Sequence, residues 1–212
     1  VMPRQCIFAD KGPAAFVERD LTDQILITLA ILSSAAFIYE VLLQMAFGSY
    51  EVGVIQKTPF PGIDAETGDQ LSSLAHRAWS LKRTLDTITE TSHAFYLPEV
   101  LRDRLGDYDP PAIEAELADI QTEIDDIAFD LYGFTDADRV AATGPVSEDE
   151  DDTEDEEAEA AVPSTDALLS WAVGVAFGRF DWRLATGERD APEEPDPFDA
   201  LPAKSPGMLP DG

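Results

Sequence analysis

The stretch Pro110–Gly133, which reads PPAIEAELADIQTEIDDIAFDLYG, decides the fold. Two prolines open it and a glycine closes it; proline is favoured at the first position of a helix, and glycine just beyond its end. Its large apolar residues alternate at intervals of four and three: Ile113, Leu117, Ile120, Ile124, Ile127 and Leu131. This pattern predicts a long helix with a narrow apolar seam that packs against one partner helix.

The segment before this helix supplies a partner of similar length. From Asp69 to about Thr91 the apolar residues follow helical spacing, at Leu71, Leu74, Ala75, Ala78, Leu81, Leu85 and Ile88. We expect the two helices to fold back on each other as an antiparallel hairpin, which would form a rigid spacer. Pro98–Leu105 predicts a further helical turn between them.

The N-terminal part predicts one buried helix. Thr22 or Asp20 can cap a helix that runs to about Met45, and its nearly continuous apolar residues indicate burial on most sides. Its most apolar part, Ile25–Tyr39, is shorter than the ~20 residues that cross a bilayer. We therefore expect a buried helix and no membrane partner.

The segment Phe47–Pro61 predicts a short strand that displays polar side chains. An aromatic-glycine turn leads into Tyr50–Gln56, which alternates in character, and a Pro-x-Pro sequence stops the strand. Gln56 and Lys57 lie at its end. Glutamine can pair with adenine and lysine with guanine, so both are candidates for reading base edges.

The C-terminal third alternates between polar and apolar composition. Residues 141–163 are too acidic and too poor in apolar groups to offset chain entropy, and we expect them to be disordered. Thr165 is suited to cap a helix at Ala167–Phe177. The Pro-rich tail, Ala191–Gly212, should be extended and poorly ordered. The fold class is mainly α with a small β component.

The chain has a net charge of −29, and ten of the twelve residues Glu148–Glu159 are acidic. The excess also extends beyond this run. One interpretation is an acidic protein that binds basic partners. The other, which we favour, is adaptation to high salt, where the Debye length falls to ~3 Å and the charge repels DNA far less.

Motifs that would carry chemistry are missing from this sequence. Asp109-Pro110-Pro111-Ala112 resembles the adenine-binding motif of methyltransferases, but Ala112 replaces the stacking aromatic and the segment opens a helix. No glycine-rich cofactor loop or P-loop is present. His76 and His93 lack a third clustered ligand, and Cys6 is the only cysteine. We expect no catalytic, cofactor-binding or metal-binding residue.

The few basic residues form small groups along the chain. Arg77, Lys82 and Arg83 share one predicted helix, with Trp79 between them, and Arg102 and Arg104 share the next segment. Such groups could contact DNA phosphates. The alternative is that each cation merely neutralises nearby carboxylates.

Several segments in order resemble one family. They are Ile7–Pro13, Phe47–Pro61, Leu74–Arg83, Thr89–Phe95, Phe129–Gly133, Phe177–Arg183 and Pro195–Phe198. Together they resemble the adenine-specific DNA methyltransferase of BREX-type phage-exclusion systems, which is close to fused type II restriction-modification methylases. Family members are several times longer and carry their catalytic and cofactor motifs upstream of this region.

The resemblance implies that the chain is a slice through the target-recognition region and the helical spacer of such an enzyme. The parent would methylate adenine N6 with S-adenosylmethionine, in double-stranded DNA, and the chain could pair with a separate methyltransferase half or other defence-system subunits. The implied segments are 1–62, a partial target-recognition domain; 63–140, a helical hairpin spacer; 141–163, an acidic linker; 164–190, a short helical segment; and 191–212, the Pro-rich tail.

The DNA-contact candidates are Lys11, Gln56, Lys57, Arg77, Lys82 and Arg83. No signal peptide is visible, and we expect a cytoplasmic protein. Two alternatives stay open: a non-enzymatic acidic interaction protein, which would bind a basic partner through Glu148–Glu159, and a non-functional gene remnant.

Overall fold

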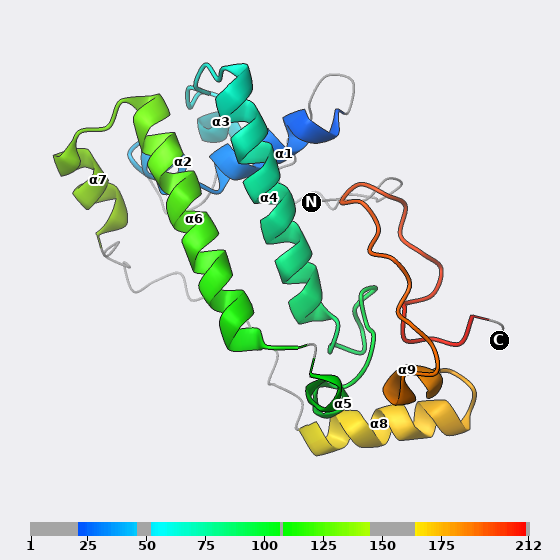
Figure 1. The fold of residues 1–212 in the computed structure, drawn as a ribbon. Helices are drawn as coiled ribbons and strands as arrows, with labels where there is room; N and C mark the ends of the chain where they lie inside the picture. The colour runs from blue at the N-terminus through cyan, green and yellow to red at the C-terminus, as the bar shows by residue number, and fades with distance from the viewer. Residues whose placement is uncertain (1–20, 46–51, 107, 145–163, 211–212) are drawn as a thin grey trace. The chain divides into compact units, whose positions relative to one another are not determined.

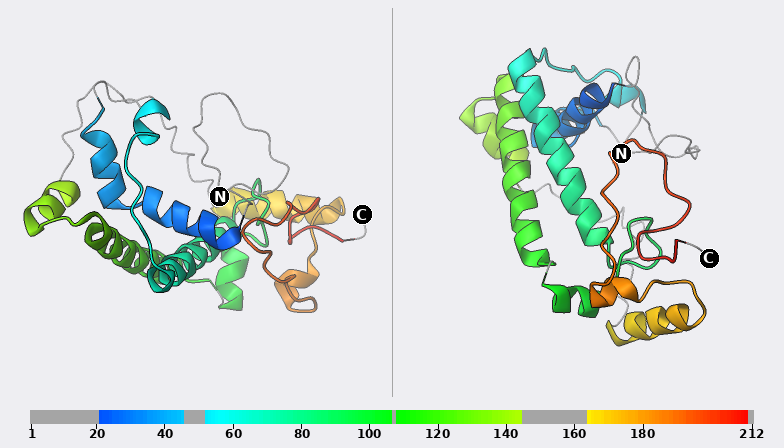
Figure 2. Two further views of the ribbon diagram at one scale, coloured as in Figure 1. Left: turned by 90° about the horizontal axis from the view of Figure 1, so that it is seen from above. Right: turned by 45° about the vertical axis from the view of Figure 1, so that its right-hand side comes forward.

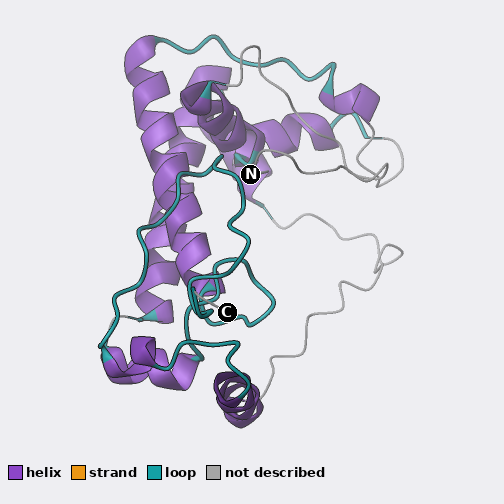
Figure 3. Cartoon of the chain, turned by 90° about the vertical axis from the view of Figure 1, so that its right-hand side faces the viewer, coloured by secondary structure: helices purple, strands orange, loops and turns teal. Residues whose placement is uncertain are grey.

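The structure is a computed structural model that describes residues 21–45, 52–106, 108–144 and 164–210. In these ranges the regular elements are helices, and an isolated bridge between Phe180 and Met208 is the only β pairing (Figures 1 and 3). The helices are α1 (Thr22–Leu32), α2 (Ala35–Leu42), α3 (Val52–Ile55), α4 (Ala65–Asp86), α5 (Glu99–Leu105), α6 (Pro110–Tyr132), α7 (Asp136–Thr143), α8 (Ser164–Ala176) and α9 (Arg183–Thr186).

The prediction of a mainly α protein is confirmed, whereas the predicted strand at Tyr50–Gln56 is wrong. Val52–Ile55 forms the helical turn α3, and Gln56 lies in the turn that follows it. The backbone N–H groups of Lys57 and Thr58 both donate to the carbonyl of Val54, each at 3.0 Å. A single strand without a neighbour leaves its backbone groups unpaired, whereas this turn pairs them locally.

Contacts divide the described residues into two units, and each unit combines stretches that lie far apart in the sequence. We call residues 21–45, 52–78 and 116–144 the hairpin unit, and residues 79–106, 108–115 and 164–210 the tail unit. The division falls within α4, after Ala78, and within α6, after Ala115. Of the acidic linker predicted at 141–163, the structure describes residues 141–144, and the first three of these form the end of α7. The rest of the predicted linker lies outside the described residues.

In the hairpin unit, α4 and α6 run antiparallel, as the sequence predicts. The Gln70 amide donates to Glu123 at 2.6 Å, and Arg77, seven residues further along α4, pairs with Glu116, seven residues earlier on α6. This opposite progression fixes an antiparallel register. Apolar residues of the predicted seams are buried in this unit: Leu71, Ala75, Ile120 and Ile124.

The continuous helix predicted from Thr22 to about Met45 is wrong, because Ser33 and Ser34 separate α1 from α2 with a bend of 60°. Serine hydroxyls compete with helical backbone hydrogen bonds. Ser34 accepts from the N–H of Phe37 as the cap of α2, and Asp125 of α6 accepts from the N–H of Ala35 at 2.8 Å. A partner on another helix therefore stabilises the break.

Among the described residues, no single helix is long and apolar enough to cross a membrane. Only α1 and α2 taken together reach that length and composition, and the bend separates them.

In the tail unit, α5 packs against α8 and α9, and residues 187–210 run as an irregular chain (Figure 2). Within the tail predicted to be extended and poorly ordered, Gly207 is held by backbone hydrogen bonds to residues distant in sequence. The N–H of Gly207 donates to the carbonyl of Phe95 at 2.8 Å, and the carbonyl of Gly207 accepts from the N–H of Asp181 at 2.9 Å. A Cβ atom on Gly207 would lie 2.4 Å from the carbonyl oxygen of Tyr96, so only glycine permits this approach.

Candidate nucleic-acid interface

The residues predicted to read bases lie on a loop that the hairpin unit holds in place. We call residues 56–61 the anchored loop. Its Thr58 is buried, accepts a hydrogen bond from the amide of Gln44 at 3.0 Å and donates to the carbonyl of Val54 at 3.1 Å. These bonds tie the start of the loop to the turn after α2 and to α3.

A second anchor comes from the end of α6. The hydroxyl of Tyr132 donates to the carbonyl of Pro59 at 2.8 Å. Burial, with a smaller contribution from the charge of Glu40, raises the pKa of Tyr132 to about 12. The phenol therefore keeps its proton and stays a donor across the ordinary pH range.

Between and beside these anchors, the loop turns Gln56, Lys57 and Phe60 outward. Gln56 and Lys57 are exposed, and Phe60 is 49% exposed. An amide, an ammonium group and an aromatic ring thus share one restrained segment. These groups can pair with a base edge, contact a phosphate and stack on a base, respectively.

Arg77 forms an ion pair with Glu116 within the hairpin unit. Its Nε lies 2.6 Å from Oε1 of Glu116 and its second terminal nitrogen 2.9 Å from Oε2, which makes a two-pronged pair between α4 and α6. The hydrogen bond from Arg77 lowers the pKa of Glu116. The pair joins the two helices at the surface, and the carboxylate of Glu116 neutralises the charge of Arg77.

Lys82 and Arg83 lie on the part of α4 that belongs to the tail unit. Lys82 is exposed, and within the described residues no ion pair holds it. Arg83 is half-buried over the ring of Trp79, 5.9 Å from the ring centre, with Glu194 at 3.9 Å. At about 100° per helical residue, Lys82 is turned roughly 140° from Arg77, so these cations form no single basic face. Lys11 lies outside the described residues.

Arg102, grouped with Arg104 as a possible phosphate contact, has a structural role. It is buried between the rings of Tyr96 and Tyr108, at 5.1 and 5.0 Å from the ring centres, and donates to the hydroxyl of Thr87 at 2.7 Å. The flanking tyrosines are twelve residues apart, so the sequence gives no local sign of this arrangement. Arg104 is exposed at the end of α5.

The tail unit contains a buried carboxylate that the sequence reasoning missed. Asp181 is 0% exposed and accepts two hydrogen bonds from the guanidinium of Arg183, at 2.8 and 2.7 Å, and one from Arg189 at 2.8 Å. The bonds from Arg183 are the largest cause that holds the pKa of Asp181 well below its usual range. Two guanidinium groups thus enclose this single carboxylate, and its role is structural.

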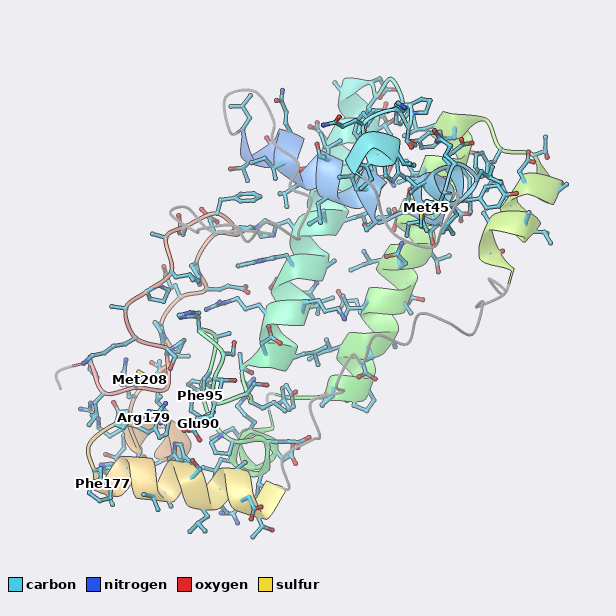
Figure 4. All side chains as sticks on the ribbon, turned by 180° about the vertical axis from the view of Figure 1, so that it is seen from behind. Met45, Glu90, Phe95, Phe177, Arg179 and Met208 are labelled. Atoms are coloured by element: carbon cyan, nitrogen blue, oxygen red, sulfur yellow. The ribbon has the colours of Figure 1, made fainter. Side chains whose placement is uncertain are left out.

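Several residues of Phe177–Arg183, a segment that carries part of the resemblance, have structural roles. Arg179 pairs with Glu90 at 2.9 Å (Figure 4). Phe180 packs on Phe95 with ring centres 5.1 Å apart. Gly178 has a φ of 75°, in the left-handed region that favours glycine. The segment thus joins α8 to the loop before α5.

A pocket of about 590 Å³ lies within the tail unit. Its three cations already have partners: Arg83 faces Glu194, Arg189 holds Asp181, and Lys204 donates to the carbonyls of Leu209 and Pro210. The remaining lining is mostly proline and alanine, with Glu193 and Asp199. The lining therefore carries three cations and two carboxylates, and we assign it no ligand.

The superficial methyltransferase motif is a helix start, as predicted. The carboxylate of Asp109 accepts from the N–H of Ala112 at 3.2 Å, and Pro110 is the first residue of α6. His76 is exposed on α4 and His93 on the loop before α5. In the described ranges, no group of three or more His, Cys, Asp or Glu side chains is arranged to hold a metal ion.

Comparison of the chain with protein-family models, with curated proteins and with solved structures finds no match.

Proposed function

We propose that the chain is a DNA target-recognition and spacer fragment of an adenine-N6 DNA methyltransferase from a phage-defence or restriction-modification system. The observation that carries the proposal is the anchored loop, on which Gln56, Lys57 and Phe60 face solvent while Thr58 and Pro59 are fixed by hydrogen bonds. The ordered segments of family resemblance support the assignment to a methyltransferase.

Restraint of the loop matters because recognition by a flexible segment has to order that segment on binding. Fixing the backbone of one residue costs about 1–2 kcal/mol. The bonds from Gln44 and Tyr132 settle the backbone beforehand. The loop can then offer an amide and an ammonium to a groove without a large ordering cost.

The antiparallel α4–α6 pair of the hairpin unit supplies the spacer. Its exposed cross-links, Gln70–Glu123 and Arg77–Glu116, hold the register of two long helices. A separate methyltransferase half would supply S-adenosylmethionine binding and catalysis, because this chain contributes neither. We place the fragment in the cytoplasm, where double-stranded DNA and the other defence subunits would be its partners.

Binding to duplex DNA tests the role of the loop. Fluorescence anisotropy with a mixed-sequence duplex, run across a range of high salt, should give about a tenfold weaker affinity for Lys57→Ala. Gln56→Ala should change the sequence preference more than the overall affinity. Arg104→Ala, which removes an exposed cation from the tail unit, is the matched control. Equal losses for Lys57→Ala and Arg104→Ala would contradict a role for the loop.

Restored methylation tests the enzyme assignment. The chain is mixed with candidate catalytic halves and S-adenosylmethionine, and N6-methyladenine is quantified in duplex DNA by mass spectrometry. We expect methylation only with both halves present, and a lower rate with Gln56→Ala or Lys57→Ala. Absence of methylation and of co-purification with every candidate half would overturn the proposal of a split enzyme.

The alternative of an acidic interaction protein depends on Glu148–Glu159, which lies outside the described residues. It predicts pairing with basic proteins that fades as salt rises. The proposed function predicts DNA binding that persists in molar salt. A chain that binds neither DNA nor a catalytic half would match the third alternative, a gene remnant.

A further inference from the structure

Helix α8 of the tail unit carries a row of apolar side chains on its outer face. Leu169 is 63% exposed, Val173 is 48% exposed, and Phe177, directly after the helix, is 86% exposed. They recur at intervals of four, with the exposed Ala172 and Ala176 beside them. We call these five residues the α8 stripe.

The opposite face of α8 is the one that packs against the tail unit. Gly174 is buried, and a Cβ atom added there would lie 2.3 Å from the ring of Phe180. Ser170, on the flank, donates to Glu90 at 2.7 Å. The orientation of α8 is therefore set by its inner face, and the stripe is left outward.

Single exposed apolar residues are ordinary, but a contiguous row is a mark of an interaction surface. The described part of the tail unit does not cover the stripe, as the exposure of its residues shows. The row contains no charge from Leu169 to Phe177, although the chain carries 43 acidic residues. Exposing apolar surface of this length to water costs free energy, and this cost favours a binding partner that covers the stripe.

We propose that the α8 stripe is the interface with a second copy of this chain, with two α8 helices packed antiparallel around a twofold axis beside Val173. In this register Leu169 faces the small Ala176 of the second copy, and Val173 faces the small Ala172. Leu169 and Val173 thus meet small residues near the axis, which lets the two helices approach closely there. A twofold interface must be complementary to itself, and this stripe meets that requirement.

Charge at the two ends of the stripe favours the antiparallel arrangement. Asp166 lies in the first turn of α8, and Arg179, which is half-exposed and also pairs with Glu90 of its own chain, follows the last turn. An antiparallel pair brings each Asp166 toward the end where the other copy has Arg179. A parallel pair would instead place the two Asp166 carboxylates together, and like charges at close range oppose association.

The size and charge of the surfaces predict a weak dimer that salt strengthens. The stripe offers a few hundred Å² from each copy, on the order of half of the ~800 Å² per partner in a standard interface. Each copy also carries a net charge of −29, which repels the other at low ionic strength. Salt screens this repulsion and leaves the apolar contact.

Sedimentation velocity across a range of protein and salt concentrations tests the dimer. We expect the intact chain to associate, with a dissociation constant that falls as salt rises. Val173→Asp should weaken association about tenfold or more, because it places two carboxylates at the axis. Val140→Asp is the matched control, since Val140 is also a highly exposed valine but lies on α7 in the hairpin unit. Circular dichroism checks that both variants keep their helices.

Disulfide trapping tests the register independently of any loss of folding. In a Cys6→Ser background, Val173→Cys should form an intermolecular disulfide at high salt much faster than Thr165→Cys, which lies at the end of the helix. Equal trapping rates, a monomer at every salt concentration, or equal effects of Val173→Asp and Val140→Asp would each overturn the proposal. The inference does not depend on DNA binding, so a failed DNA assay leaves it standing.

Discussion

The hairpin unit and the tail unit reach a fixed structure by different means. The hairpin unit has long helices with apolar seams, and its cross-links between α4 and α6, such as Arg77–Glu116, lie at the surface. The tail unit has short helices and irregular chain, with a buried carboxylate at Asp181 and a backbone contact at Gly207 that leaves no room for a side chain. The first design spreads its stabilisation over many residues, and the second concentrates it in a few.

The largest effect should come from the buried carboxylate of the tail unit. Asp181→Asn keeps the shape but removes the negative charge that holds Arg183 and Arg189, and hydrogen bonds to charged groups are worth about 1.5–3 kcal/mol. Asp190→Asn, an exposed carboxylate in the same unit, should change stability little. Urea unfolding followed by circular dichroism measures both. Similar midpoints for the two variants would contradict the contrast between the units.

Acid should act on the same cluster. The pKa of Asp181 is lower in the folded chain than in the unfolded chain, so its stabilising contribution is present above the unfolded value of about 4 and is lost as the pH falls below it. The stability of the intact chain should therefore decline with acid more steeply than that of Asp181→Asn. Parallel pH profiles for the two would show that the carboxylate is not held by its arginines.

Glycine positions should give the next largest effect. Gly207→Ala forces a Cβ atom against the carbonyl of Tyr96, and Gly174→Ala forces one against the ring of Phe180. Overpacking of this kind costs about 1–3 kcal/mol. Gly62→Ala, where nothing lies within 4 Å, is the control in the hairpin unit. A large loss for Gly62→Ala in thermal unfolding would remove the distinction between the units.

The anchors of the loop should contribute less to overall stability than to local order. Tyr132→Phe removes one hydrogen bond to the carbonyl of Pro59, at a cost of about 0.5–1.5 kcal/mol. Hydrogen exchange should speed up at residues 56–61 while α6 changes little. Absorbance titration should also lose the phenol that ionises at about 12. Unchanged exchange in the loop would show that Tyr132 does not restrain it.

The smallest effect should come from the surface pair of the hairpin unit. Exposed ion pairs are worth about 0.2–1 kcal/mol, so Arg77→Gln and Glu116→Gln should each lower stability slightly and show a small coupling in a double-mutant cycle. High salt should reduce that coupling further. A coupling comparable to the loss from Asp181→Asn would contradict the comparison between the units.

The sequence alone determined the two long helices and the ends of α6. Seam spacing in Pro110–Tyr132 predicts α6, Gly133 adopts the left-handed conformation that ends it, and Asp109 caps its start. Helical spacing from Asp69 onward likewise predicts most of α4. These features can be read locally because a helix pairs its backbone within itself and repeats every 3.6 residues. Of the candidate site, the sequence identified Gln56 and Lys57 but not the loop that holds them.

Only the tertiary structure decided three features: the break at Ser33–Ser34, the turn in place of a strand at Val52–Ile55, and the attachment of the tail at Gly207. Each depends on a partner distant in sequence: Asp125 for the break, Tyr132 for the loop that follows the turn, and Phe95 for Gly207. The local sequence does not indicate such partners, because they contribute only after folding has brought them into contact. The two long helices of this protein could therefore be predicted from its sequence, whereas the break, the turn and the contacts of the tail could not.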